Sequence, residues 1–347
     1  MTARDGWTYL DHAATSPLKE EVRRAMGATA LGSATPSEAR EALARALGVA
    51  PTQLWLTPGG SAANNLALAG ARGHVLSQPS EHPSVLRALE ALAAKGCEVE
   101  LLPLDGEGRV DPAGLRRALR PETSLVTIMH ANNETGCLQP IAELARALEG
   151  HRARLHVDAV QSAPWFDVRP AALGATWVTL SLHKLGGPRG IGVLLGPPPP
   201  QAEELALGTD VLAGAIAAIA ARRPQAAAAV RASRLRLEAG ILARVPDAQI
   251  HAAGAERLPG IVNISAPGVS GDALVLELER SEIAVATGAA CASGDPAPSH
   301  VLRALGATPE EARASVRFSL GEPMEPTQIE RVCAVYARAV ERLRNLS

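Results

Sequence analysis

The chain has 347 residues, a length that allows two or three domains. Hydrophobic residues make up 47% of it and charged residues 20%, a globular balance that argues against a disordered chain. The 34 basic and 36 acidic side chains leave a formal charge of −2, and aromatic residues reach only 2%. Neither nucleic acid nor an anionic membrane is therefore an expected partner.

Seven short apolar runs between about residues 53 and 195 predict the strands of an α/β domain. Helix-like stretches separate these runs, an alternation typical of a parallel or mixed sheet, and nearly all-apolar strands are expected where helices cover both faces. The predicted strands are Gln53–Leu56, His74–Ser77, Val99–Leu102, Ser124–Met129, Arg154–Val157, Thr176–Leu180 and Gly192–Leu195. The predicted helices include Ser61–Ala71, Pro83–Ala94, Pro112–Leu119 and Ile141–Leu148.

Four consecutive prolines, Pro197–Pro200, follow the last of these strands and predict a rigid surface connection. Long Ala/Arg/Leu helices then run to about Ala243, and a smaller α+β region follows them. Its predicted strands are Gly260–Ser265, Ile283–Ala286 and Val316–Leu320, and its predicted helices are Asp272–Leu278, Pro298–Leu305 and Thr327–Leu343.

The N-terminus has no apolar run suited to a signal peptide. The longest apolar tract, Val211–Ala221, is shorter than the roughly 20 residues that span a bilayer. We therefore expect a soluble, cytoplasmic protein without a membrane partner. Four cysteines lie far apart without a CxxC motif, so neither a metal site nor a disulfide framework is expected; they are Cys97, Cys137, Cys291 and Cys333.

Lys184 stands between an apolar strand and a glycine-rich turn, in SLHKLGGPRGIG. A lysine at the end of a buried strand is unusual, because an isolated ammonium group is costly to desolvate. The chain holds only two other lysines, Lys19 and Lys95, and the following glycines allow close backbone approach to a ligand. Lys184 is a candidate Schiff-base residue for an aldehyde cofactor, and an ordinary surface lysine is the alternative.

Polar residues follow two other strands, at the edge where ligands collect in open α/β sheets. Asp158 and Gln161 lie in HVDAVQS. The acid suits a pyridinium nitrogen as well as it suits a helix N-cap. Gly59-Gly60-Ser61 precedes a helix and can bind phosphate through backbone amides, although a capped glycine turn is the commoner meaning.

Two further positions have both a chemical and a structural reading. Cys291 lies among Gly, Ser and Pro residues, which favours a loop thiol over a buried small hydrophobe. Arg317 lies inside an apolar strand and needs an anion, either a substrate carboxylate or an internal acid. His82 in SEHPSV is placed near a helix start, and Asn133 in HANNETG belongs to a polar turn after a strand.

Taken together, these segments resemble the cysteine desulfurases of the NifS/IscS-like branch of class V aminotransferases, which are pyridoxal-phosphate enzymes of fold type I. The matching blocks follow the order of the family and cover most of the chain. They are YLDHAATSPL, LTPGGSAANNLALAG, SEHPSVL, IMHANNETGCLQPI, HVDAVQS, SLHKLGGPRGIG, LPGIVNIS, TGAACASGDPAPSHVLRALG and VRFSLG.

The resemblance implies a large pyridoxal-phosphate domain over residues 14–228, with a mixed, mostly parallel seven-stranded sheet between helices. It implies a smaller α+β domain over residues 1–13 and 229–347 that carries the cysteine loop and the substrate arginine. It also implies a homodimer that takes L-cysteine and passes sulfur to an acceptor protein in Fe–S cluster, thio-cofactor or tRNA pathways.

The resemblance also implies a role for each matching residue. Lys184 binds the cofactor aldehyde and moves the α-proton, and Cys291 takes the sulfur as a persulfide. Asp158 pairs with the pyridine nitrogen, Gln161 bonds the ring hydroxyl, and His82 stacks on the ring and helps proton transfer. The remaining roles concern the phosphate, held by Gly60, Ser61, Ser181, His183 and the neighbouring subunit's equivalent of Thr209, and the substrate carboxylate, held by Asn133 and Arg317.

The sequence departs from the family pattern in three places. The segment near residues 32–38 is short, and the run before Thr209 is reduced to ALALGTD without its usual arginine. Ala62 stands where the phosphate turn usually has an acid. A selenocysteine lyase, another class V aminotransferase and a non-catalytic regulator of the same fold remain alternatives.

Overall fold

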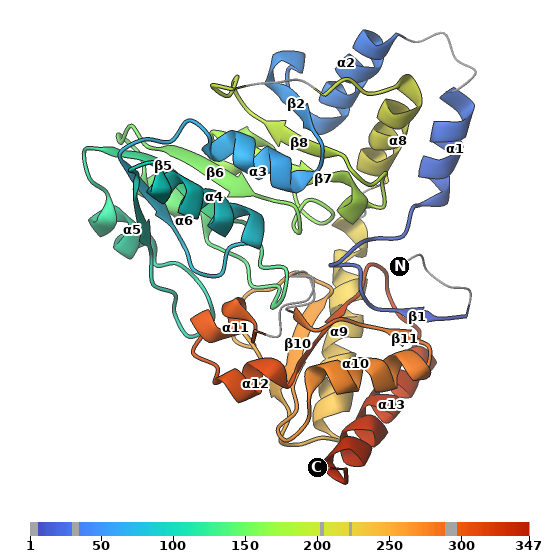
Figure 1. The fold of residues 1–347 in the computed structure, drawn as a ribbon. Coiled ribbons are helices and arrows are strands. Elements are labelled where there is room, and N and C mark those ends of the chain that lie inside the picture. The colour runs from blue at the N-terminus through green and yellow to red at the C-terminus, as the bar shows by residue number, and fades with distance from the viewer. Residues whose placement is uncertain (1–5, 30–34, 202–204, 222–223, 289–296, 347) are drawn as a thin grey trace.

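The computed structural model describes residues 6–29, 35–201, 205–221, 224–288 and 297–346. Its largest feature is a seven-stranded sheet with the strand order β2-β8-β7-β6-β5-β3-β4 (Figure 1). Only β8 runs antiparallel to its neighbours. The strands are β2 (Leu54–Thr57), β3 (His74–Ser77), β4 (Glu98–Leu101), β5 (Thr123–Met129), β6 (Arg154–Asp158), β7 (Trp177–Ser181) and β8 (Gly192–Leu195). The predicted mixed, mostly parallel sheet is confirmed.

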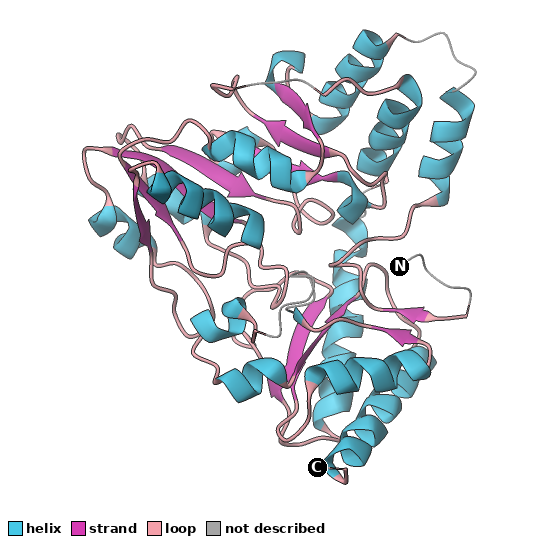
Figure 2. Cartoon of the chain, viewed as in Figure 1, coloured by secondary structure: helices cyan, strands magenta, loops and turns pink. Residues whose placement is uncertain are grey.

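Helices cover both faces of this sheet (Figure 2). On β3, Val75 packs into a cluster with α3 and α4, whereas its neighbour Leu76 packs into the cluster on the opposite face. Burial on both faces explains why the strands read as continuous apolar runs. The helices of this part are α1 (Glu20–Thr29), α2 (Pro36–Leu47), α3 (Gly60–Leu68), α4 (Pro83–Ala94), α5 (Pro112–Ala118), α6 (Ile141–Ala147), α7 (Pro170–Leu173) and α8 (Thr209–Ala220).

Helices α1 and α2 are not among the elements predicted from the sequence. Helix α2 has a clear start signal, because Thr35 and Glu38 form a capping box around Pro36. The predicted helix Ser61–Ala71 is shorter in the structure, where α3 ends at Leu68. Pro197–Pro200 follows β8 outside any helix or strand, and three of its four prolines are exposed, as expected of a surface connection.

The C-terminal third packs around its own hydrophobic cluster. An antiparallel sheet of order β12-β10-β9 lies there, and β1 from the N-terminus pairs in parallel with β11. The first strand therefore lies beside residues near position 283, far away in the sequence. The elements are β1 (Thr8–Tyr9), α9 (Ala227–Leu242), β9 (Gln249–Ile250), β10 (Ile261–Ser265), α10 (Gly271–Arg280), β11 (Ile283–Ala284), α11 (His300–Ala304), α12 (Pro309–Arg313), β12 (Ser315–Ser319) and α13 (Pro326–Arg344).

The predicted strand Ile283–Ala286 is two residues shorter in the structure, and Ala286 instead forms an isolated bridge with Arg317. Within the described ranges, no helix is long and apolar enough to cross a bilayer. The same part of the chain contains no group of three or more His, Cys, Asp or Glu residues placed to hold a metal ion.

Candidate active site

A cavity of about 180 Å³ lies at the carboxyl ends of β5, β6 and β7. These strands are adjacent and parallel, and they end at Met129, Asp158 and Ser181 respectively, so the side chains that follow them converge on one edge. A cavity of this size accepts a six-membered ring. Nine predicted site residues line it: Gly60, Ser61, His82, Asn133, Asp158, Gln161, Ser181, His183 and Lys184.

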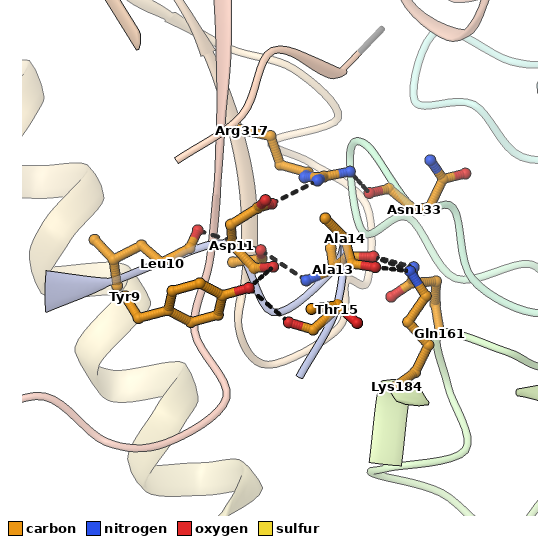
Figure 3. A network of polar contacts seen from close by, with 11 residues as sticks. Tyr9, Leu10, Asp11, Ala13, Ala14, Thr15, Asn133, Gln161, Lys184 and Arg317 are labelled. Carbon is orange, nitrogen blue, oxygen red and sulfur yellow. Dashed lines mark hydrogen bonds and ion pairs between the residues drawn. The ribbon is translucent and has the colours of Figure 1, made fainter. Parts of the chain in front are cut away.

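Lys184 reaches the cavity from a short 3₁₀ turn, Leu182–Leu185, directly after β7. Its Nζ atom donates to the carbonyl oxygens of Ala13 at 2.5 Å and Ala14 at 2.6 Å (Figure 3). Gln161 donates from Nε2 to the same Ala13 oxygen at 2.9 Å. Residues 13–16, which we call the N-terminal turn, thus fix the lysine ammonium group through main-chain atoms.

Side chains of the N-terminal turn also anchor the lysine turn itself. The hydroxyl of Thr15 lies 2.7 Å from Nδ1 of His183, and Ser16 donates from Oγ to the Lys184 carbonyl oxygen at 2.9 Å. Burial lowers the pKa of His183 to about 4, helped by the charges of Lys184 and Arg189. His183 is therefore a neutral ring in the cavity wall at neutral pH.

Asp158 is a buried residue of the cavity lining, and both of its carboxylate oxygens accept a hydrogen bond. The backbone N–H of Val160 donates to Oδ1 at 3.0 Å, and the Asn64 amide donates to Oδ2 at 2.7 Å. Both donors hold the carboxylate in a fixed orientation. A buried anion in this position suits a protonated ring nitrogen.

The first turn of α3 forms one end of the cavity. Gly59 has a φ of 97°, a conformation that favours glycine, and it turns the chain from β2 into the helix. A Cβ atom on Gly60 would lie 3.2 Å from Cβ of Ser181 and 3.3 Å from Cγ2 of Val160. Glycine at this position therefore allows Ser181 and Val160 to pack closely against the start of α3. The backbone N–H groups of a helix start bind a phosphate group well.

His82 is the N-cap residue of α4, and its Nδ1 atom receives two contacts from Ser84. The Ser84 backbone N–H donates to Nδ1 at 3.1 Å, and the Ser84 hydroxyl lies 2.8 Å from the same atom. Asn64 donates to that hydroxyl oxygen at 3.0 Å, so the serine proton is left for His82. A neutral His82 ring therefore carries its proton on Nε2. Burial lowers its pKa.

Arg317 lies beside the cavity but not in its lining. It is fully buried, pairs with Asp11 at 2.8 Å and donates to the carbonyl oxygen of Asn133 at 3.0 Å (Figure 3). Its carboxylate partner in this structure is therefore the internal acid Asp11. Asn133, whose backbone it holds, does line the cavity. Thr209 begins α8 outside the lining, and Cys291 lies outside the described residues.

Four contributors to the site were not singled out from the sequence: Asp11, Thr15, Asn64 and Ser84. Asn64 had a signal, because it stands three residues after Ser61 and so shares a face of the helix with it. Asp11 had a weaker signal, as an acid inside the YLDHAAT block. The carbonyl groups of Ala13 and Ala14 had no sequence signal, because every residue has a backbone carbonyl group.

The fold and the cavity define a pyridoxal-phosphate enzyme of fold type I, and the chain belongs to the aminotransferase class-V family. The family model matches residues 8–215 and 208–332. Its relatives include two bacterial proteins named cysteine desulfurase IscS. That of Dictyoglomus turgidum is 34% identical and covers 98% of this chain and 96% of its own length. That of Anaeromyxobacter sp. strain Fw109-5 is 35% identical and covers 98% and 94%.

Among solved structures, DndA of Streptomyces lividans superimposes with a TM-score of 0.71 at 32% identity. The match covers 90% of this chain and 99% of that one. The cofactor of the family is pyridoxal 5′-phosphate, and the residues present fit it. A buried carboxylate, a lysine amine, a helix N-terminus and a ring-sized space lie together in one cavity.

Proposed function

We propose that the protein is a cysteine desulfurase, which takes sulfur from L-cysteine, releases L-alanine and keeps the sulfur as a persulfide on Cys291. A single observation carries this proposal. The cavity gathers Lys184, Asp158 and His82 in a chain about one third identical, over nearly its whole length, to proteins named cysteine desulfurase. The persulfide sulfur then passes to an acceptor protein, such as an Fe–S cluster scaffold.

We assign the cofactor contacts according to chemistry and place. Lys184 binds the aldehyde carbon, and Asp158 holds the proton on the ring nitrogen. The bound cofactor supplies an electron sink for the negative charge that forms at the substrate α-carbon. Gln161 bonds the ring hydroxyl, and the phosphate group is held by Gly60, Ser61, Ser181 and His183, with the partner subunit's Thr209 completing the site in a homodimer.

Lys184 displaced from the aldehyde is the base that receives the α-proton. Its ammonium form has two carbonyl acceptors waiting, those of Ala13 and Ala14, which stabilise the protonated lysine. His82 stacks on the ring as a neutral imidazole that presents the proton of Nε2. We therefore expect His82 to act first as a proton donor, from Nε2.

We assign the substrate carboxylate to Asn133 and Arg317. Asn133 reaches the cavity directly, and the buried Arg317 lies immediately behind it. Asp11 occupies one edge of the guanidinium group. A substrate carboxylate therefore has to share Arg317 with Asp11, or take its place.

We expect Ser84→Ala to raise the pKa of His82. A donor to Nδ1 stabilises only the neutral ring, because the protonated ring has no lone pair there. Loss of one hydrogen bond of about 1 kcal/mol corresponds to about 0.7 pH unit. NMR titration of ¹⁵N-labelled histidine, with His82→Gln for assignment, measures the shift. Ser162→Ala, which removes a hydroxyl that donates to the Ala159 carbonyl oxygen, is the control. An unchanged His82 midpoint in Ser84→Ala contradicts the hydrogen-bond assignment.

The direct test of the proposed function is an assay of the purified protein loaded with pyridoxal 5′-phosphate. We expect L-cysteine and a thiol reductant to give L-alanine and sulfide in equal amounts. L-selenocysteine and an amino-group acceptor such as pyruvate are assayed in parallel. Turnover of L-selenocysteine alone makes the protein a lyase for that substrate, and amino transfer without sulfide makes it an aminotransferase. Either result overturns the proposal.

A further inference from the structure

A second cavity, a groove of about 400 Å³, lies at the amino ends of the strands of the large sheet, at the opposite end of the strands from the active site. The amino ends of four strands border it. Trp177 is the first residue of β7, Arg154 the first of β6, Ser124 the second of β5, and Gly73 precedes β3. The active-site cavity lies at the carboxyl ends of the same parallel strands. The two sites are thus separated by the length of the sheet.

Positive charge dominates this groove. Its lining contains Arg72, Arg152 and Arg154, against a single acid, Glu122. Within the part of the chain that the structure describes, none of the three guanidinium groups forms an ion pair. Nearby Arg120 behaves differently, because it pairs with two glutamates at 2.6 and 2.8 Å.

One of the three guanidinium groups is already oriented. The Arg154 guanidinium carbon lies over the ring of Trp177, 5.0 Å from its centroid. Such stacking is favourable and leaves the N–H groups at the rim of the guanidinium plane available for a ligand. The Trp177 ring is itself fixed, because its Nε1 donates to the carbonyl oxygen of Pro197 at 2.9 Å.

The groove is long compared with a single anion. Strands β7, β6, β5 and β3 are consecutive in the sheet, and neighbouring strands lie about 4.8 Å apart. The four strand ends therefore span about 14 Å, the length of four or five extended residues at about 3.3 Å each. A lone phosphate or carboxylate group contacts only part of this length.

We propose that the groove binds a short, extended acidic segment of a partner protein. Guanidinium groups pair with carboxylates through two parallel hydrogen bonds, so three unpaired arginines along the groove are complementary to spaced aspartate or glutamate side chains. A partner bound there leaves the active-site cavity open. The inference does not depend on the reaction assigned to that cavity.

The test uses the full chain loaded with its cofactor and the fluorescein-labelled peptide Gly-Glu-Asp-Glu-Asp-Gly, followed by fluorescence anisotropy. We expect saturable binding that weakens as NaCl rises from 20 to 200 mM. Arg152→Gln combined with Arg154→Gln is expected to weaken binding about tenfold, as the loss of two exposed ion pairs. Tripolyphosphate is titrated in parallel as a small polyanion.

The matched control is Arg116→Gln combined with Arg338→Gln, which removes two exposed charges from α5 and α13. Unchanged affinity in this control, with weaker binding in the groove variant, supports the proposal. Equal affinity in both variants overturns it, as does absence of peptide binding. Displacement of the peptide by tripolyphosphate at far lower concentration than by unlabelled peptide assigns the groove to a small polyanion instead. Circular dichroism confirms that both variants are folded.

Discussion

Lys184→Ala is expected to lower L-alanine formation at least about 1,000-fold and to abolish the visible absorption band of the bound cofactor. The variant removes both the amine that bonds the aldehyde carbon and the base that takes the α-proton. No other lysine replaces it. The chain holds only Lys19 and Lys95 besides, and neither lines the active-site cavity.

Lys184→Arg separates the two contributions of this residue. Arginine keeps a cation beside the Ala13 and Ala14 carbonyl groups but does not bond the aldehyde carbon at neutral pH. We expect it to be as inactive as Lys184→Ala. Lys95→Ala, an exposed position at the end of α4, serves as the control and retains full activity. More than a tenth of wild-type activity in Lys184→Ala contradicts the assignment.

Cys291→Ala is expected to reduce persulfide formation and sulfur transfer below detection while the absorption band of the cofactor is unchanged. A thiolate is needed to take sulfur, and the described cysteines are poorly suited to the task. Burial raises the pKa of Cys137 to about 12 and that of Cys333 to about 11, so both stay protonated. Cys97 donates to the carbonyl oxygen of Ala71. Ala71 lines the groove at the amino ends of the strands, away from the active-site cavity.

Alkylation of the persulfide after incubation with L-cysteine, followed by mass spectrometry of the peptides, measures this effect directly. Cys97→Ser is the matched control and is expected to keep a persulfide at the wild-type level. A wild-type rate of sulfide release by Cys291→Ala contradicts the nucleophile assignment. Failure of Cys291→Ala to bind cofactor shows instead that the substitution disturbs the fold.

The strands of the large sheet could be predicted to within one residue, most clearly where they are fully buried and largely apolar, as in β3, β7 and β8. Their order could not be predicted. The place of β8 between β2 and β7 depends on pairing between residues more than one hundred positions apart, such as Leu54 and Leu195. Helices α1 and α2 could not be predicted from alternation with strands, because they follow one another without a strand between them.

The active site was predictable where a residue type signals its chemistry. Lysine after a strand, an acid at a strand end and glycines before a helix are such signals, and Lys184, Asp158 and Gly60 line one cavity. Contacts through the backbone or through a second side chain give no such signal. The Asp11–Arg317 pair is of this kind, since it exists only once distant segments meet.

Because backbone carbonyl groups anchor Lys184, this contact does not depend on which side chains stand at positions 13 and 14. Any small residue at positions 13 and 14 provides the same two acceptors. A substitution there is therefore expected to leave the lysine contacts unchanged as long as the backbone follows the same path. That path depends on the pairing of β1 with β11 and of Asp11 with Arg317. An affinity tag or a truncation that disturbs β1 is therefore equivalent to an active-site mutation, and a C-terminal tag is the better choice for producing the enzyme.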